Sequence, residues 1–204
     1  MKARLLGIGL ALAVLLSAGA VAQEKAAKGK KAAGPPDEKA MMEAMQKAGT
    51  PGDAHKKLEA VVGTFDVKMK MWMDPTKPAE ESTGSSENSW VLGGHYVEMK
   101  YQGTFMGQPF SGIGYQGYDN VQKKYVGTWM DSASTGIMTS TGSMTGNVMK
   151  TSGMVADPMT GKMCKITSKV TIADNDHHTM EMWGAGQDGN MYKMMEINYT
   201  RKKS

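Results

Sequence analysis

Apolar and polar residues alternate one by one through most of the chain that follows Val62. In the first run, from Phe65 to Met73, apolar residues occupy the odd positions, and the even positions hold an aspartate, two lysines and a tryptophan. A period of two is typical of a strand with one face buried. Similar runs follow at regular spacing, so we expect about ten strands. The later runs are 85–92, 95–103, 109–118, 123–131, 136–144, 148–156, 163–172, 178–185 and 191–201.

Short turn sequences separate these runs, among them Gly93-Gly94, Asp119-Asn120 and the stretch 187–190. Glycine, asparagine and aspartate tolerate the backbone conformations that tight turns need. Connections this short leave no room for a helical crossover, so neighbouring strands must pair antiparallel. An up-and-down order places the last strand beside the first, which favours a closed barrel over a two-sheet sandwich. We therefore predict an all-β fold, an antiparallel up-and-down barrel of about ten strands.

Residues 37–61 depart from the period of two and have helical spacing instead. Asp37 can cap a first helix, and Pro51 suits the first position of a second one. Three methionines of the first helix share one face. We expect this short helical segment to cover one end of the barrel.

The first 22 residues have the three-part layout of a signal peptide. Lys2 and Arg4 precede an uncharged apolar run at 5–16, and small residues then lead to Ala22. The apolar run is shorter than the roughly twenty residues that a membrane-spanning helix needs. We predict cleavage after Ala22 and export, either to the periplasm or out of the cell. The mature protein would then have no transmembrane segment.

The stretch that follows the signal peptide is rich in alanine, lysine, glycine and proline, and it has no apolar period. Such a composition is typical of a disordered linker. The predicted organisation is a signal peptide at 1–22, a linker at 23–36, a helical segment at 37–61 and a barrel at 62–204.

Charge and cysteine content narrow the possible partners and the source of stability. Lys2 and Arg4 are two of the 24 basic residues, so the cleaved chain carries 22 basic and 20 acidic residues, a net charge of +2. This near-neutral balance gives no reason to expect nucleic acid or an anionic membrane as partner. Cys164 is the one cysteine. An internal disulfide is therefore excluded, and we expect Cys164 to be buried and inert.

Several stretches resemble a known family. The most specific are Gly117–Asn120 (GYDN), Lys124–Ser132 (KYVGTWMDS) and Asp157–Lys162 (DPMTGK). They resemble a bacterial domain-of-unknown-function family of exported proteins described as lipocalin-like or calycin-like barrels, and the resemblance covers about 55–201. It implies the barrel fold and a bacterial setting, and it brings no reaction, cofactor or catalytic residue. One departure is His95, since an arginine often follows the glycine pair in that family.

A tryptophan and a carboxylate on one strand face suggest a small-molecule site. If Trp129 and Asp131 point inward, they form a polar anchor in an apolar cavity, the usual composition of such a site. A buried carboxylate needs a partner, which His95 or Arg201 could supply. The alternative is that Asp131 lies at the rim and caps a turn at Ser132. Sequence alone leaves both open.

Methionine supplies an unusual share of the apolar residues, 21 in all. Met69 and Met71 share one strand face and, with Tyr101, would line an adaptable apolar pocket. Thioethers also bind Cu(I), but copper sites concentrate their ligands, whereas these methionines occur in nearly every run. We therefore favour packing over a copper site. The predicted ligand-binding residues are Met69, Met71, His95, Tyr101, Trp129 and Asp131.

The remaining candidate chemistry is sparse. His177 and His178 are neighbours and point to opposite faces of a strand, so they cannot share a metal ion, and we expect them to be solvated in a turn. The chain has no HExxH motif, no zinc pattern and no G-x-S-x-G elbow. We predict neither a metal site nor catalytic residues.

The leading hypothesis is an exported barrel that binds a small apolar or amphipathic ligand. An enzyme that uses the same cavity is a second hypothesis, and it needs convergent ionisable groups such as Asp131 and His95. A filled structural barrel without a cavity is the third. An interior void of a few hundred Å³ would separate the first two from the third. The ligand, any cofactor and the oligomeric state stay open.

Overall fold

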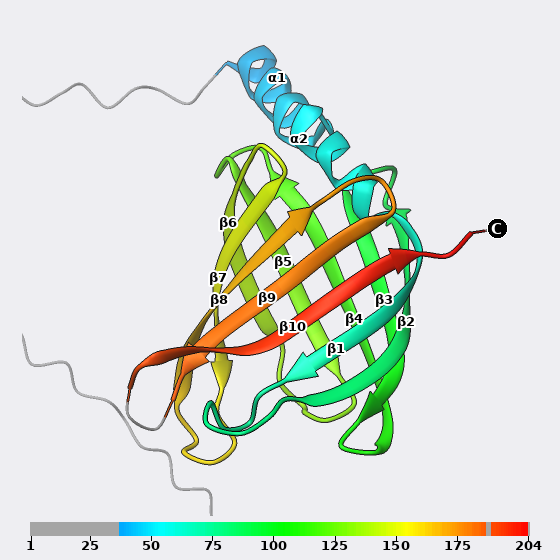
Figure 1. The fold of residues 1–204 in the computed structure, drawn as a ribbon. Helices are drawn as coiled ribbons and strands as arrows, with labels where there is room; N and C mark the ends of the chain where they lie inside the picture. Colours follow the sequence, from blue (N-terminus) through cyan, green and yellow to red (C-terminus); the bar gives the residue numbers. More distant parts are fainter. Residues whose placement is uncertain (1–36, 187–188, 204) are drawn as a thin grey trace, which may run out of the picture. The chain divides into compact units, whose positions relative to one another are not determined.

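The computed structural model describes residues 37–186 and 189–203. The predicted signal peptide and linker, 1–22 and 23–36, lie outside the described residues. Three short helical elements come first and ten strands follow (Figure 1). None of the helices in the described part combines the length and the apolar character that crossing a bilayer requires.

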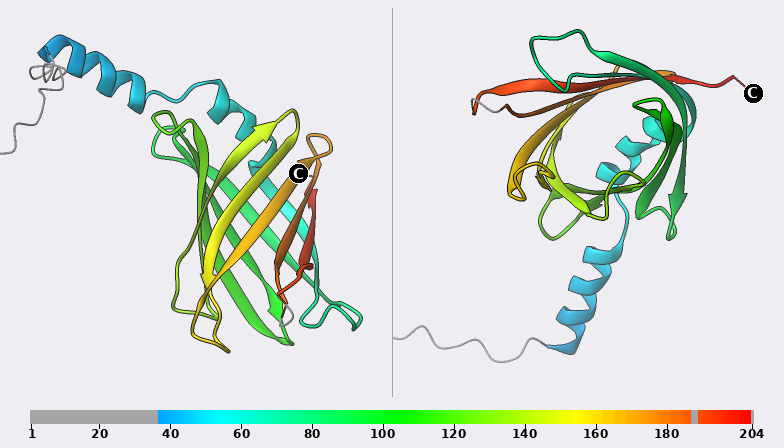
Figure 2. Two further views of the ribbon diagram at one scale, coloured as in Figure 1. Left: turned by 90° about the vertical axis from the view of Figure 1, so that its left-hand side faces the viewer. Right: turned by 90° about the horizontal axis from the view of Figure 1, so that it is seen from below.

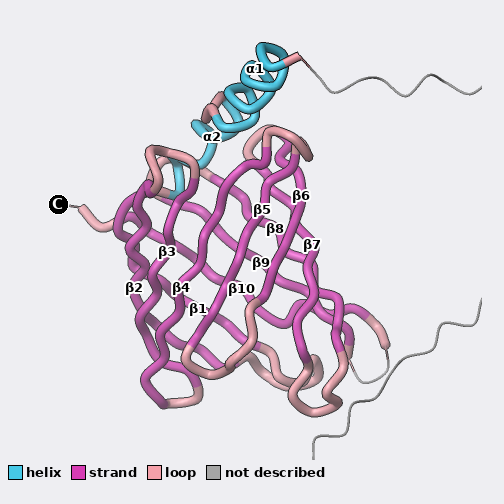
Figure 3. The backbone as a smooth tube through the Cα atoms, turned by 180° about the vertical axis from the view of Figure 1, so that it is seen from behind, coloured by secondary structure: helices cyan, strands magenta, loops and turns pink. Residues whose placement is uncertain are grey.

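Ten antiparallel strands close into a single barrel. Each strand pairs with its neighbours in sequence, and the last strand returns to pair with the first. The strands form the wall of the barrel, and the view from behind shows its other side (Figure 3). The strands are β1 (Gly63–Met71), β2 (Glu80–Val91), β3 (Tyr96–Phe105), β4 (Gln108–Asp119), β5 (Lys124–Asp131), β6 (Met138–Thr145), β7 (Val148–Ala156), β8 (Met163–Ile172), β9 (His177–Ala185) and β10 (Met191–Arg201). The predicted all-β up-and-down barrel is confirmed, and the sandwich is excluded.

Several strand boundaries differ from the sequence prediction by one or two residues, and the start of β2 differs most. β2 begins at Glu80, well before the expected start at residue 85. By their pairing with β1, its first inward positions are Glu80, Ser82 and Gly84, which carry no apolar pattern. β1 ends at Met71, and the Trp72 N–H still donates to the Met194 carbonyl of β10 at 2.9 Å.

The pairing register determines which side chains point into the barrel. Phe65, Val67 and Met69 are buried, whereas the charged residues between them are exposed. Directly paired residues of antiparallel strands share a face. Ile197 and Tyr199 of β10, which pair with Met69 and Val67, therefore also face inward. The same step, repeated around the barrel, assigns the inward positions of every strand.

One end of the barrel is closed by residues 53–61, the last part of the predicted helical segment, whereas residues 38–49 form a helix with no buried residue and do not cover the barrel. We call this closed end the upper end, and it is the end at which β1 begins (Figure 2). Leu58 and Val61 are buried there against barrel residues. The Tyr125 hydroxyl donates to the Ala54 carbonyl at 2.9 Å and fixes the segment to β5. The helical elements are α1 (Glu38–Gly49), α2 (Asp53–Lys56) and the 3-10 helix η1 (Lys57–Val61).

Arg201 fastens the last strand to this plug. Its guanidinium donates to the carbonyls of Val62 and Ala60 at 2.6 and 3.2 Å, and it lies 4.6 Å from the Phe65 ring centre. The close approach requires a glycine at position 63, because a Cβ there would lie 2.1 Å from an Arg201 nitrogen. The φ angle of Gly63, +130°, also favours glycine.

Candidate functional site

One side of the barrel interior is apolar and tightly packed. We call it the apolar wall, and its buried residues come from β1, β3 and β10. Half-buried side chains from neighbouring strands pack against them. The buried residues are Val67, Met69, Tyr101 and Ile197, and the half-buried ones are Met71, Phe110, Trp129, Met180, Met195 and Tyr199.

The opposite side of the interior is built from small residues. In the strand order β6 lies directly across the barrel from β1. Two rows of paired inward positions cross β5 to β8. Six of their eight residues are small and half-buried, whereas the other two, Tyr125 and Ile166, are large and buried. This small-residue wall consists of Gly127, Ser140, Gly142, Thr151, Gly153 and Ser168.

The small-residue wall also offers hydrogen-bonding groups. The Thr151 and Ser168 hydroxyls are bonded to each other at 2.6 Å. The Gln116 side chain, buried beside Gly127, donates to the Val126 carbonyl at 2.9 Å. A hydroxyl keeps one donor and two acceptor positions, so the Thr151–Ser168 pair retains capacity for a further partner. The interior is therefore amphipathic, with apolar surface on one side and hydroxyls on the other.

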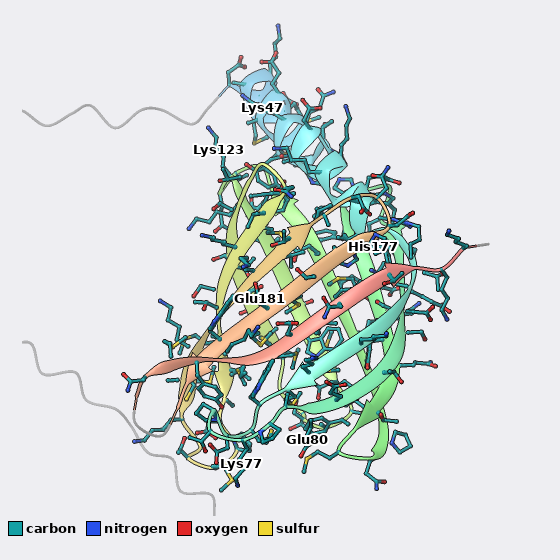
Figure 4. All side chains as sticks on the ribbon, viewed as in Figure 1. Lys47, Lys77, Glu80, Lys123, His177 and Glu181 are labelled. Atoms are coloured by element: carbon teal, nitrogen blue, oxygen red, sulfur yellow. The ribbon has the colours of Figure 1, made fainter. Side chains whose placement is uncertain are left out.

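A pocket of about 180 Å³ lies at the lower end, opposite the helices. Met69 and Met71 belong both to this lower pocket and to the apolar wall. Ser82 and Thr104 add hydroxyls, and Glu80 adds a carboxylate at the edge (Figure 4). The pocket resembles in volume the cavity of about 150 Å³ that admits benzene. It suits a single ring or a short acyl chain rather than a drug-sized molecule.

Tyr101 brings an unsatisfied hydroxyl close to this pocket. The side chain is buried, and its hydroxyl has no hydrogen-bond partner. A Cβ on Gly84 or Gly103 would lie 2.5 or 2.3 Å from that oxygen, so the phenol extends along β3 toward Thr104 of the pocket lining. Burial raises the pKa of the Tyr101 phenol, so it remains a neutral donor. A buried donor without an acceptor is costly, and a bound ligand could satisfy it.

Four predicted site residues meet in the lower half of the barrel. Met69, Met71, Tyr101 and Trp129 belong to one packed cluster. The Trp129 ring lies against the backbone of Gly112, where a Cβ would approach it to 2.2 Å. The indole N–H of Trp129 donates to Asp131, so five of the six predicted residues are connected.

Asp131 is placed as the rim alternative describes. One of its oxygens accepts the Trp129 indole N–H at 3.0 Å, and the other accepts the backbone N–H groups of Ala133 and Ser134. The carboxylate therefore fixes both the indole and the turn after β5. Its predicted ionic partners, His95 and Arg201, lie at the upper end, at the start of β3 and the end of β10.

His95 contacts the end of α1 rather than the lower site. Its two ring nitrogens lie 2.5 Å from the Leu92 carbonyl oxygen and 2.7 Å from the Gly49 carbonyl oxygen. Asn120 also donates to carbonyls there, at 3.0 Å to Ala48 and 2.8 Å to Thr50.

A second pocket of about 160 Å³ lies beside these contacts, lined by His55 and His95 among others. Burial and the neighbouring His95 lower the pKa of His55, whose Nδ1 accepts the Gly52 N–H at 3.1 Å. The structure thus separates His95 from Asp131, so the pair that an enzyme hypothesis required is not formed.

His178 is a buried group that the sequence prediction placed wrongly. β9 already begins at His177, so His178 points inward and is 5% exposed. It stacks on Tyr199 with ring centres 4.3 Å apart, and its Nδ1 has no hydrogen-bond partner. Burial, with a smaller contribution from the charge of Arg201, lowers the pKa of His178 to about 4. His177 is exposed as predicted, and its Nδ1 lies 2.9 Å from Asp174.

The described residues offer no obvious metal site. No group of three or more histidine, cysteine, aspartate or glutamate side chains within 37–186 and 189–203 is arranged to hold an ion. Cys164 is half-buried rather than buried. The inward methionines come from several strands, and the pairing places Met71, Met195 and Met182 in one row. By register they are Met69, Met71, Met99, Met138, Met144, Met149, Met180, Met182 and Met195.

Comparisons with known proteins agree with the fold. The barrel is similar to the crystal structure of Rv2717c from M. tuberculosis, with a TM-score of 0.55 and 17% identity over 76% of this chain and 100% of that one. It is also similar to the S-type phycobiliprotein lyase CPES from Guillardia theta, with a TM-score of 0.51 and 11% identity over 83% and 99% of the two chains. At these identities the likeness concerns the fold alone. No curated protein matches the chain. Residues 50–201 match the model of a family described as a protein of unknown function, DUF1579.

Proposed function

The chain belongs to the DUF1579 family, and we propose that this member uses its barrel to bind a small amphipathic molecule. The observation that carries the proposal is the small-residue wall. A barrel selected only for stability would fill those positions with larger apolar side chains, because close packing stabilises a core. Instead, six small, half-buried residues, three of them with hydroxyls, lie across the interior from Met69 and Ile197.

The ligand's size and polarity follow from the two walls. An apolar ring or short chain would pack on the apolar wall and extend into the lower pocket. A hydroxyl, carbonyl or ether group on the ligand would bond to Thr151, Ser168 or the unpaired Tyr101 hydroxyl. The upper end is plugged by Leu58 and Val61, so the ligand would enter from the lower end.

The proposal is for binding rather than catalysis. Asp131 and His95, the ionisable pair named for an enzyme, lie at opposite ends of the barrel. Asp131 is engaged by Trp129 and by its own turn. We also propose that the protein acts in the periplasm or outside the cell, on the basis of the signal-peptide layout of residues 1–22.

The test adds a side chain at the small-residue wall and leaves the outer surface unchanged. Ser140→Leu adds an apolar side chain to the small-residue wall, whereas Thr141→Leu adds the same side chain to the exposed outer face of β6. We expect the wild type and the Thr141 variant to bind the neutral fluorescent probe N-phenyl-1-naphthylamine, and the Ser140 variant to bind it at least tenfold more weakly. Thr151→Val, which removes a hydroxyl without adding volume, serves if Ser140→Leu does not fold.

Two results would count against the proposal. Equal probe affinity in the Ser140 and Thr141 variants would show that the small-residue wall does not line the binding site. No probe binding by the wild type, together with no retained small molecule in a native mass spectrum of freshly purified protein, would favour the filled structural barrel.

A further inference from the structure

Exposed apolar side chains gather at the lower end of the barrel. Since the strands alternate in direction, five connections lie at that end: those that follow β1, β3, β5, β7 and β9. Each of these connections carries at least one large apolar residue that is 50 to 91% exposed, within it or at its boundary with the next strand. We call this set the loop ring, and its members are Met73, Met106, Ile137, Met159, Met163 and Met191.

The upper end of the barrel differs from the lower end. The exposed large apolar residues on its connections and first strand positions are Leu92, Tyr96 and Val121. Its other exposed apolar residues belong to α1. Single exposed apolar residues are common on protein surfaces, but one on every connection of the same end forms a patterned surface. Such a surface marks an interaction site.

The loop ring and the lower pocket lie at the same end of the barrel. Met106 belongs to both, since it is part of the pocket lining next to Phe105. A surface that contacts the loop ring at Met106 therefore also lies at this pocket.

These connections carry charges of both signs. Asp74 lies 3.6 Å from the Lys77 ammonium, and the Asp157 carboxylate accepts from Thr160 and from the backbone of Met159. With Lys162, the described parts of the five connections carry two lysines and two aspartates. This balance suits neither an anionic nor a cationic partner, and it is compatible with a neutral, zwitterionic surface.

We propose that the loop ring docks the barrel, lower end first, on a zwitterionic lipid surface, where the ligand passes between the bilayer and the barrel. This inference rests on the proposed ligand binding. The apolar residues belong to separate loops at one end of the barrel, and a fluid bilayer adapts to such a ring without a matching shape. Methionine is unbranched and flexible, so its side chains insert among acyl chains at low steric cost. Insertion is shallow, because charged side chains such as Lys169 and Glu181 cover the outer barrel wall.

The test uses flotation of full-length protein with phosphatidylcholine vesicles. We expect the wild type to float with the vesicles, and roughly 0.5 M salt to leave this unchanged, because the attraction is apolar. Met106→Ser combined with Met159→Ser should lower the floated fraction at least tenfold. Leu92→Ser combined with Val121→Ser removes residues that are 75 and 74% exposed at the other end, and it should leave flotation unchanged.

Three outcomes would overturn the inference. The wild type could fail to float, both double variants could lose flotation equally, or the ring variant could float as well as the wild type. A concentration-dependent dimer that is lost in the ring variant, without flotation, would assign the loop ring to a second copy instead. Failure of the proposed function is measured separately. Ser140→Leu leaves the loop ring unchanged, so its effect on probe binding tests the ligand site, whereas flotation tests the loop ring.

Discussion

His178 makes the stability of the barrel depend on pH in a range where few other groups titrate. In the folded protein its pKa is about 4, against an ordinary value of 6.5. Between these two pH values the unfolded chain binds a proton that the folded chain does not. The free energy of unfolding therefore falls as the pH decreases from 6.5 to 4. The difference between the two pKa values corresponds to about 3 kcal/mol, of which about 2 kcal/mol is already lost at pH 4.5.

The variant His178→Phe should remove this dependence. Phenylalanine keeps an aromatic ring against Phe65 and Tyr199, and it removes an Nδ1 that is buried without a partner. Replacing an unsatisfied polar group with an apolar one of similar shape is nearly neutral or stabilising. We expect the variant to match or exceed the wild type at pH 7.5 and to be more stable by about 2 kcal/mol at pH 4.5.

Urea denaturation at half-unit pH steps from 7.5 to 4.5 measures the effect. Carboxylates with lowered pKa values, such as Glu181 and Asp174, also lose their contribution on acidification, but they do so equally in both proteins and cancel in the difference. His177→Gln is the control, because His177 is exposed; it removes the contact with Asp174 but should keep the pH dependence that His178 contributes. Parallel curves for wild type and His178→Phe would refute the reasoning. So would an NMR titration that gives His178 a pKa near 6.5.

Three further changes test packing that the structure shows directly. Gly112→Val places a side chain against the Trp129 ring and should cost about 1–3 kcal/mol with a shift in tryptophan emission, and the shift should vanish in a Trp129→Phe background. Arg201→Leu removes the hydrogen bonds that fasten β10 to the plug and should lower the free energy of unfolding by about 2–3 kcal/mol. Arg201→Lys should recover part of this loss, and equal losses in the two variants would contradict a role for the hydrogen bonds. Tyr125→Phe loses the bond to Ala54 and should cost about 1 kcal/mol in urea denaturation, whereas no change would show that η1 is held by Leu58 and Val61 alone.

The strand architecture was predictable because apolar and polar residues alternate in most of the strands. Phe65, Val67 and Met69 are apolar and lie between charged neighbours, and such a pattern predicts a strand with one buried face. The small-residue wall was not predictable as a wall. Gly142 and Gly153 occupy inward positions, yet glycine and serine at those positions look like turn or surface residues until a register assigns their face. The early start of β2 was missed for the same reason.

The relations between distant side chains were the hardest to predict. His95 and Asp131 were plausible partners by chemistry, but one begins β3 and the other ends β5, so up-and-down order places them at opposite ends. His178 was assigned to a turn because polar residues surround it, whereas its pairing with Ile172 and Tyr199 places it on the inward face of β9. Spacing, in contrast, correctly placed Trp129 and Asp131 on one strand face, although the hydrogen bond between them was not predicted.

Closure of the barrel by β1 and β10 means that the first strand made is completed by the last. Residues 63–71 leave the ribosome long before their partner at 191–201 exists, and until then one edge of β1 has no neighbour. A chain that terminates before Met191 keeps open edges on both β1 and β9, and it also lacks the Arg201 fastening. Premature termination products should therefore aggregate or be degraded, which could be followed by pulse-chase comparison of the full chain with one that stops at residue 190. The pairing of β1 with β10 thus forms only in a chain that has been made to its last strand, and the C-terminal strand is a poor place for tags or truncations.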